Sequence, residues 1–414
     1  MPSIQTSPHP LVFKTQHATA LGIASPNPAP IAIRTIARAL DGMQKEALVS
    51  YGQDGAAWRM VCDEGPYLNG TDLAPFPLAF FTAGLAFSTL SEILALAKQR
   101  GIVLRDIEFT QENRYGMEGS ALAGTMTGSA LPVELAVRID ADADAAALND
   151  LIVAAVAASP ANGLLRELLT SEFSLTVNGR RVSTGRVAAY ADDAPADPAA
   201  DAATVFDTAS PLQQGYVSDI IQKLESAQTL VGVEGGAGTS LAAEQKRELQ
   251  VRGVCRLRPD GLKEVSVQLL KPIGSVFRFL SDDSTFLGGQ ARAPSGLAYL
   301  SAGIAFCYLT QLGRYTHIVK KRLDGYRIVQ DTRFSLPGAS GASGASGASG
   351  ASGGTGKAGQ AEAVVTHVYL DTPEGDDFAR TLVDMGEQTC FLHAACRSVV
   401  KTKIRCNRFA APSQ

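Results

Sequence analysis

The chain has 414 residues, of which 45% are hydrophobic and 19% are charged, and its formal net charge at pH 7 is −4. This length predicts two or three domains, each with enough apolar material for a core. The 37 basic residues are scattered along the chain, which argues against a protein held to nucleic acid by phosphate contacts. The composition also excludes disorder of the whole chain.

The N-terminus and the cysteines indicate a cytoplasmic protein. The segment MPSIQTSPHPLVFKTQ has no cationic start followed by an apolar stretch, so it does not look like a signal peptide. The longest apolar run, 297–309, is too short to cross a bilayer, and we expect a buried core helix there rather than membrane contact. The six cysteines are too few for a disulfide framework, which favours a reducing compartment. They are Cys62, Cys255, Cys307, Cys390, Cys396 and Cys406.

An internal match is the clearest feature of the sequence. Residues 58–115 align with residues 277–334 without a gap, at an offset of 219, and 16 of the 58 positions are identical. The pattern AGxAF occurs at 83–87 and again at 302–306. Further along, the offset becomes 231, because the second copy carries a Gly/Ala/Ser insert near 338–358 that we expect to be disordered. The match indicates a tandem duplication.

Each copy predicts the same elements in the same order. Alternating apolar and polar residues predict strands, a long apolar helix follows, and further strands, two shorter helices and a last strand complete the copy. The expected ranges are strands over 31–62 and 250–282, helices at about 76–99 and 295–321, strands at 104–115 and 323–334 and then at 131–140 and 362–371, and a last strand such as 173–177.

The domain organisation follows from this pattern. We expect an N-terminal extension at 1–30, a first copy at 31–187, a linker at 188–247 and a second copy at 248–414. The linker begins with an Ala/Asp/Pro-rich stretch and carries one amphipathic helix at about 211–226. It ends in GVEGGAGTS (232–240), whose glycines lack the lysine of a phosphate-binding loop.

Two cysteines of the second copy replace serines of the first. Cys307 lies in the apolar helix where the first copy has Ser88, and Cys390 begins a later helix where the first copy has Ser159. A thiol at a helix N-terminus feels the positive end of the helix dipole, which lowers its pKa. One copy would then carry a thiol chemistry that the other lacks. The alternative is that both cysteines are small core residues.

These features resemble the OsmC/Ohr family, the osmotically induced and organic hydroperoxide resistance proteins. The resemblance rests on a β-rich start with DE or DD, then G-G, then A-P-x-x-L before a long helix with a cysteine after AGxAF, and on a second cysteine opening a late helix. It covers 31–180 and 248–409. It implies an α+β fold in which bent antiparallel sheets wrap two long central helices, the two tandem copies forming an intramolecular pseudo-dimer.

The resemblance also implies a thiol peroxidase that reduces organic hydroperoxides. Cys307 would attack the peroxide and become a sulfenic acid, and Cys390 would resolve it as a disulfide. A hydrophobic small-molecule substrate and a thiol or dithiol reductant are then the partners, and no cofactor is expected. The glutamate that family members carry at the start of the cysteine helix is absent from 294–298. Arg278, Arg292 and Arg333 are the candidates to lower the thiol pKa in its place.

Two other chemistries use the residues after Cys390. His393 and Cys396 follow it at i+3 and i+6, so the side chains could approach one another along a helix. A cysteine-dependent hydrolase or transferase would attack a carbonyl with Cys307 or Cys390 while His393 moves the proton. A zinc site would use the same residues, but a stripe along a helix is atypical of structural zinc, and we expect no metal.

The last alternative is a non-catalytic protein that binds a hydrophobic ligand. Aromatic residues at the starts of the two long helices would line a cleft between the copies. They are Phe76, Phe80, Phe81 and Tyr299. The same four residues serve equally well as ordinary core.

Overall fold

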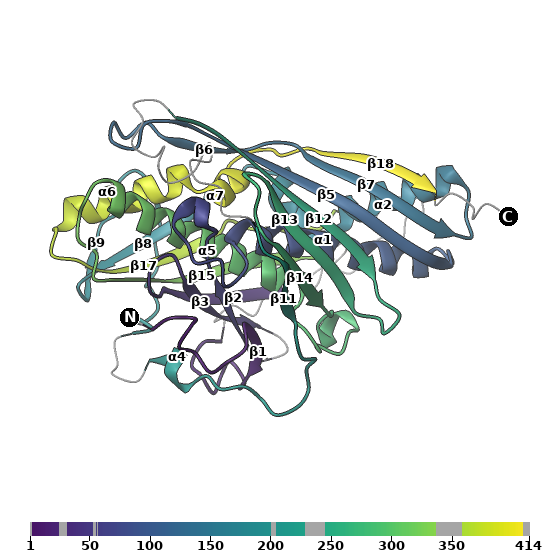
Figure 1. Cartoon of the computed structure of the whole chain (residues 1–414), viewed down its shortest axis with the longest axis horizontal. Coiled ribbons are helices and arrows are strands. Elements are labelled where there is room, and N and C mark those ends of the chain that lie inside the picture. Colours follow the sequence, from purple (N-terminus) through teal and green to yellow (C-terminus); the bar gives the residue numbers. More distant parts are fainter. Residues whose placement is uncertain are drawn as a thin grey trace, which may run out of the picture.

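The computed structural model describes residues 2–24, 31–52, 55, 57–199, 204–227, 245–336 and 358–408. They form a mixed α+β structure in which two sheets enclose long central helices (Figure 1). Apart from Ala358, the insert expected to be disordered lies outside the described residues, and so does the glycine-rich stretch 232–240.

The first sheet contains strands from both halves of the chain. Its order is β1-β4-β3-β2-β15-β17-β8-β10, with β16 paired to β15 and β9 to β8. The strands are β1 (Val12–Thr15), β2 (Ile31–Ala39), β3 (Lys45–Tyr51), β4 (Ala57–Cys62), β8 (Glu172–Val177), β9 (Arg180–Val182), β10 (Ala188–Ala189), β15 (Gly325–Ser335), β16 (Gln360–Ala361) and β17 (Val365–Asp371).

The second sheet is built in the same mixed way, and Figure 1 shows its long strands running along one side of the helices. Its order is β11-β14-β13-β12-β5-β7-β18, with β6 paired to β5. The strands are β5 (Leu104–Gly119), β6 (Thr127–Ala130), β7 (Val133–Ala141), β11 (Ile221–Glu225), β12 (Gln245–Leu257), β13 (Lys263–Lys271), β14 (Val276–Ser281) and β18 (Thr402–Arg408).

The halves of the chain therefore meet inside both sheets. Strand β2 pairs antiparallel with β15, and β5 pairs antiparallel with β12. Each of these two seams carries an arginine–carboxylate pair. Arg34 Nε donates to Asp331 at 2.8 Å, and Arg252 Nε donates to Glu112 at 2.9 Å. Because both sheets cross between the halves, neither half can be removed without opening both sheets.

The two long helices, α1 (Pro77–Gln99) and α5 (Gly296–Ile318), confirm the expected central pair and pack closely against each other. Glycine permits the approach. A Cβ on Gly84 would lie 2.5 Å from the Leu300 nitrogen, and one on Gly303 would lie 2.7 Å from the Phe81 nitrogen. Any larger residue would have to push the helix backbones apart.

Helix α5 extends well beyond the apolar run 297–309, on which the expectation of no membrane contact was based. Each of the two long helices has 23 residues and is long and apolar enough to cross a membrane by length and composition, as is the bent pair α2 (Ala145–Ala158) and α3 (Pro160–Arg166) if it is taken as one span. The argument from length was therefore wrong. In this structure, 78% of the most apolar window of α1 and 94% of that of α5 are buried inside the fold.

The shorter helices come in two bent pairs. Helix α2 is followed by α3, and α6 (Asp376–Thr389) is followed by α7 (Phe391–Cys396). Ser159 ends α2 and begins α3 in an extended conformation, and Cys390 does the same between α6 and α7. After Ser159 the break is encoded locally, because a proline disfavours helical geometry in the residue before it. The remaining short helices are α4 (Val205–Thr208), η1 (Pro66–Leu68) and η3 (Thr285–Leu287).

The linker differs from the expectation. The amphipathic helix at 211–226 is wrong, because residues 221–225 form β11 instead and pair antiparallel with β14. An edge strand has unpaired backbone groups, and β11 covers that edge of the second sheet. In the first sheet, β1 of the N-terminal extension covers β4 in the same manner.

Candidate functional site

The structure brings the two predicted cysteines together. Cys307 lies in the middle of α5, Cys390 lies at the N-cap of α7, and their side chains interact with each other. The backbone N–H of Leu392, in the first turn of α7, donates to the Cys307 sulfur. Both cysteines are buried and free. We call Cys307 and Cys390 with their surroundings the dithiol site.

Burial dominates the electrostatics of Cys307. It raises the pKa of the Cys307 thiol well above the usual value of 9.0, and the contact with Cys390 raises it further, while the Leu392 N–H acts against both. The neutral thiol is therefore the main form of Cys307 at pH 7 in this conformation. Formation of the thiolate requires water or a substrate to reach the site.

The first half of the chain supplies a buried carboxylate to this site. Glu64 follows β4, and its side chain accepts hydrogen bonds from Thr310 Oγ1 at 2.8 Å and from the Tyr67 hydroxyl at 3.0 Å. Lys45 Nζ lies 3.9 Å from the same carboxylate. Burial raises the Glu64 pKa, and the charge of Lys45 opposes that rise. The negative charge of Glu64 in turn raises the pKa of Cys307.

Helix α5 presents a polar face to this carboxylate. Cys307, Thr310, Gln311 and Arg314 follow one another at i, i+3, i+4 and i+7, so they share one side of the helix. Arg314 donates to Gln311 Oε1 at 3.2 Å, and burial lowers its pKa while Glu64, Tyr67 and Cys307 raise it. Arg314 therefore lies two turns beyond Cys307 on the same side of α5.

A cleft of about 670 Å³ lies along the C-terminal half of α5. This volume falls in the range of small-molecule sites. Both halves line it, with Leu40, Met43 and Leu68 from the first and Arg314, His317 and Tyr326 from the second among the lining residues. Arg314 is the residue that the cleft and the charge environment of Cys307 share. Cys307 lies two helical turns before Arg314 on the same helix and does not itself line the cleft.

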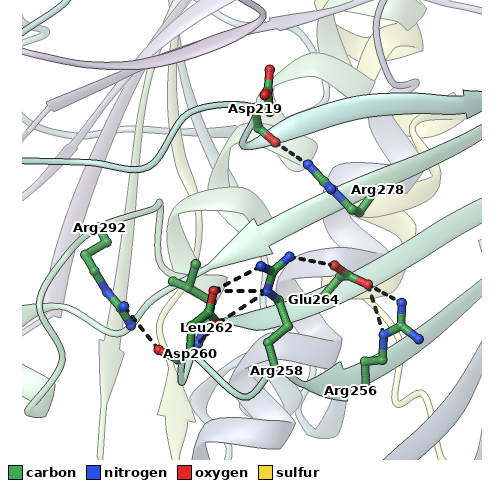
Figure 2. A network of polar contacts seen from close by, with 8 residues as sticks. All are labelled: Asp219, Arg256, Arg258, Asp260, Leu262, Glu264, Arg278 and Arg292. Carbon is green, nitrogen blue, oxygen red and sulfur yellow. Dashed lines mark hydrogen bonds and ion pairs between the residues drawn. The ribbon is translucent and has the colours of Figure 1, made fainter.

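The arginines proposed from sequence are placed elsewhere. Phe277 and Phe279 of β14 are buried, so Arg278 between them points to the opposite face, where it donates to the Asp219 carbonyl (Figure 2). In the same network, Arg292 donates to the Asp260 carbonyl. In this structure Arg278 and Arg292 therefore make these other contacts, and strand alternation is what turns Arg278 away from the core.

Arg333 is misplaced for the same reason. Its neighbours Thr332 and Phe334 are buried, and Arg333 forms an ion pair with Glu362 at 2.7 Å on the other face of β15. Arg314, which the cysteine helix itself carries, interacts electrostatically with Cys307, whose negative charge would raise the Arg314 pKa.

His393 is buried between aromatic rings. Its ring lies 5.2 Å from that of Tyr308 and 5.5 Å from that of Phe173, and neither ring nitrogen has a hydrogen-bond partner among the described residues. Burial lowers the pKa of His393 to about 4. This structure therefore lacks the thiolate–histidine hydrogen bond that the hydrolase hypothesis needs. Cys396 is also buried, and the part of the chain that the structure describes holds no group of three His, Cys, Asp or Glu placed to bind a metal.

The four aromatic residues predicted for a ligand cleft lie in the core. Phe80 packs edge-on against Phe279 with ring centres 5.4 Å apart, and the Tyr299 hydroxyl donates to the Leu280 carbonyl at 2.8 Å. Phe76 and Phe81 are equally buried. The cleft described above is lined by other residues, near the opposite end of α5.

A second site has the same geometry with oxygen in place of sulfur. Ser88 lies in α1, and its hydroxyl is 2.9 Å from that of Ser159. Lys263 contacts Ser91 Oγ at 2.6 Å and forms an ion pair with Asp283, which accepts from Ser91 at 2.7 Å. This group of a lysine, a carboxylate and a hydroxyl corresponds to Lys45, Glu64 and Thr310 at the dithiol site. We call Ser88 and Ser159 with their surroundings the diserine site.

Sequence reasoning missed the charged part of the dithiol site. Glu64, Lys45 and Arg314 were not proposed, although the DE doublet at 63–64 was part of the motif that carried the resemblance. The helical spacing of Arg314 from Cys307 was a second signal. Neither signal shows that the carboxylate of one half faces the thiol of the other, since that contact exists only in the folded chain.

The sequence matches no protein-family model and no curated protein. Among solved structures it is similar to an OsmC-like hydroperoxide resistance protein from Jannaschia sp. CCS1. The two share 20% identity with a TM-score of 0.25, over 37% of this chain and 97% of that one. A likeness at this level does not assign the chain to a family.

Proposed function

We propose that this chain is a thiol peroxidase that reduces organic hydroperoxides at the dithiol site. The observation that carries the proposal is the side-chain contact between Cys307 and Cys390, which lie on different helices and are 83 residues apart in the sequence. Two thiols in contact form a disulfide without a large movement of the backbone.

The reaction has two steps. The Cys307 sulfur attacks the distal oxygen of the hydroperoxide ROOH, the O–O bond breaks, and the products are the sulfenic acid of Cys307 and the alcohol ROH. The Cys390 sulfur then attacks the sulfenic sulfur, which gives the Cys307–Cys390 disulfide and releases water. A thiol or dithiol reductant restores both thiols, and we place the reaction in the cytoplasm, where such reductants are abundant.

The surrounding residues have separate tasks in this proposal. The Leu392 N–H donates to the Cys307 sulfur and stabilises the thiolate as it forms. The cleft beside Arg314 receives the apolar body of the substrate. Glu64 holds Thr310 and balances the charge of Lys45, so it positions the helix rather than taking the thiol proton.

We also propose that the chain is an internal pseudo-dimer that arose by duplication. Three features support a duplication. Strands of the two halves pair at β2–β15 and β5–β12, Gly84 and Gly303 make equivalent contacts between the central helices, and the dithiol and diserine sites correspond to each other. The dithiol site is built by both halves, with Glu64 from the first and Cys307 from the second. One half would then be needed to complete the site of the other.

Peroxide consumption by the reduced protein tests the proposal. Cumene hydroperoxide should be consumed and the Cys307–Cys390 disulfide should form, as followed by mass spectrometry. Cys307→Ser should reduce consumption to background, and Cys390→Ser should leave a sulfenic acid on Cys307. Ser88→Ala, the matched change at the diserine site, should leave the rate unchanged. If the wild-type protein consumes neither cumene hydroperoxide nor hydrogen peroxide, the proposal is wrong.

A further inference from the structure

We propose that Cys62 is a third redox thiol of the dithiol site and that it forms a disulfide with Cys307 when Cys390 does not. Cys62 is the last residue of β4 in the first half, whereas Cys307 belongs to the second. The inference extends the proposed peroxidase function, since it concerns the fate of the oxidised Cys307.

The first support is the position of Cys62 in the fold. Its side chain is completely buried, and it lies two residues before Glu64, whose carboxylate accepts from Thr310 at 2.8 Å. Thr310 is three residues beyond Cys307 on the same face of α5. Cys62 and Cys307 belong to the same buried core cluster, and a negative charge on Cys307 would raise the pKa of Cys62.

The second support is a three-for-three exchange between the sites. The offset of 219 residues places Ser88 on Cys307 and Ser281 on Cys62, and the offset of 231 places Ser159 on Cys390. Ser281 is likewise the last residue of its strand, two residues before Asp283, which accepts from Ser91. All three positions have sulfur at one site and oxygen at the other. If Cys62 only filled space, there would be no reason for it to have a serine as its counterpart, as Cys307 and Cys390 do.

The third support is the charge beside Cys62. Lys45 is the strand neighbour of Cys62 in the register of β3 and β4, and its positive charge lowers the Cys62 pKa against the larger effect of burial. A buried lysine next to a thiol favours the thiolate that attacks a sulfenic acid. Lys263 occupies the matching place beside Ser281.

The reaction balances without a further reagent. The Cys62 thiol attacks the sulfenic sulfur of Cys307, a sulfur–sulfur bond forms, and the sulfenic oxygen leaves as water. The oxidant is the hydroperoxide of the proposed function. The product joins β4 of the first half to α5 of the second, so oxidation would tie the two halves of the chain together covalently.

The test uses the full chain with Cys390→Ser and compares it with Cys390→Ser/Cys62→Ser. Both variants are oxidised with one equivalent of cumene hydroperoxide, digested without reduction and analysed by mass spectrometry, with dimedone added to trap sulfenic acid. The Cys62–Cys307 disulfide should be the main product in the first variant. The second should show at least about fivefold more dimedone on Cys307. Cys390→Ser/Cys62→Ala and far-ultraviolet circular dichroism check that the fold survives.

A parallel oxidation with diamide separates this inference from the peroxidase proposal, because diamide joins neighbouring thiols without peroxide chemistry. If diamide forms the Cys62–Cys307 disulfide while the wild-type protein consumes no hydroperoxide, Cys62 is a redox partner of Cys307 and the peroxidase function is wrong. A Cys307–Cys396 disulfide, or equal dimedone labelling of the two variants, would overturn the inference.

Discussion

The dithiol and diserine sites occupy the same kind of place in the fold and differ in chemistry. In each, a residue of a long central helix contacts the residue at the break between two short helices, Cys307 with Cys390 and Ser88 with Ser159. In each, a lysine and a carboxylate from the other half meet a hydroxyl one turn along the helix. The two sites therefore share their geometry, and the exchange of oxygen for sulfur is the difference on which the proposed peroxidase function depends.

The charges around the two sites differ as well. The offset of 219 places Glu92 on Gln311 and Ala95 on Arg314. At the diserine site, burial raises the pKa of Glu92 to about 7, and the charge of Asp283 adds to the rise. At the dithiol site, Arg314 adds positive charge instead. A site that must hold a developing thiolate benefits from this difference, whereas a pair of hydroxyls does not need it.

The largest expected difference concerns stability. Glu64→Gln should cost about 3–5 kcal/mol, because it leaves the buried Lys45 without its counter-charge. Asp283→Asn should cost only about 1–2 kcal/mol, since Asp283 is partly exposed and water can replace its contact with Lys263. Urea unfolding followed by the fluorescence of the buried Trp58 measures both. The control Lys45→Met/Glu64→Gln should recover part of the loss, and equal costs for the two single variants would show that the carboxylates are equivalent.

The second prediction concerns pH. Since burial holds the Cys307 pKa well above 9.0, the thiolate fraction should rise about tenfold per pH unit, so the rate of Cys307 oxidation should increase about 100-fold from pH 7 to pH 9. Stopped-flow measurement of sulfenic acid formation in Cys390→Ser tests this, provided that the far-ultraviolet signal is constant over the range. A flat profile would mean that the thiolate is already formed at pH 7 and that burial does not govern this site.

The third prediction compares the stability cost of a glycine substitution in the central helix of each half. Gly84→Ala and Gly303→Ala each place a Cβ against the backbone of the opposite helix, so each should cost about 1–3 kcal/mol. The cost should be slightly larger for Gly84, whose contact is the closer one at 2.5 Å. Thermal unfolding of both variants, compared with the wild-type protein, measures the effect. A negligible cost for either would mean that the helices do not pack as described.

The smallest effect is a gain of chemistry at the diserine site. Ser88→Cys/Ser159→Cys should let diamide form a second disulfide, which doubles the number of disulfides from about one to about two per chain. Thiol titration before and after oxidation counts them. The Ser88→Cys variant alone should add a free thiol and no disulfide. Failure of the double variant to close would show that the hydroxyl contact does not transfer to sulfur.

The sequence predicted most elements because their signals are local. The apolar runs at 76–99 and 295–321 and the alternation of the strands are properties of neighbouring residues, and α1, α5 and the strand order within each half agree with them. The helix expected at 211–226 failed because the open edge of β14, which is distant in the sequence, pairs with this segment as a strand.

The sequence by itself also determined the cysteine pair, since the internal match set Cys307 and Cys390 against two serines. Only the tertiary structure decided which charges surround them. Strand alternation turns Arg278 outward, His393 is enclosed by rings, and Glu64 reaches the cysteine helix across the junction of the halves. The reason is physical: helix and strand periodicity act over a few residues, whereas burial and charge depend on segments that only the assembled sheets bring together.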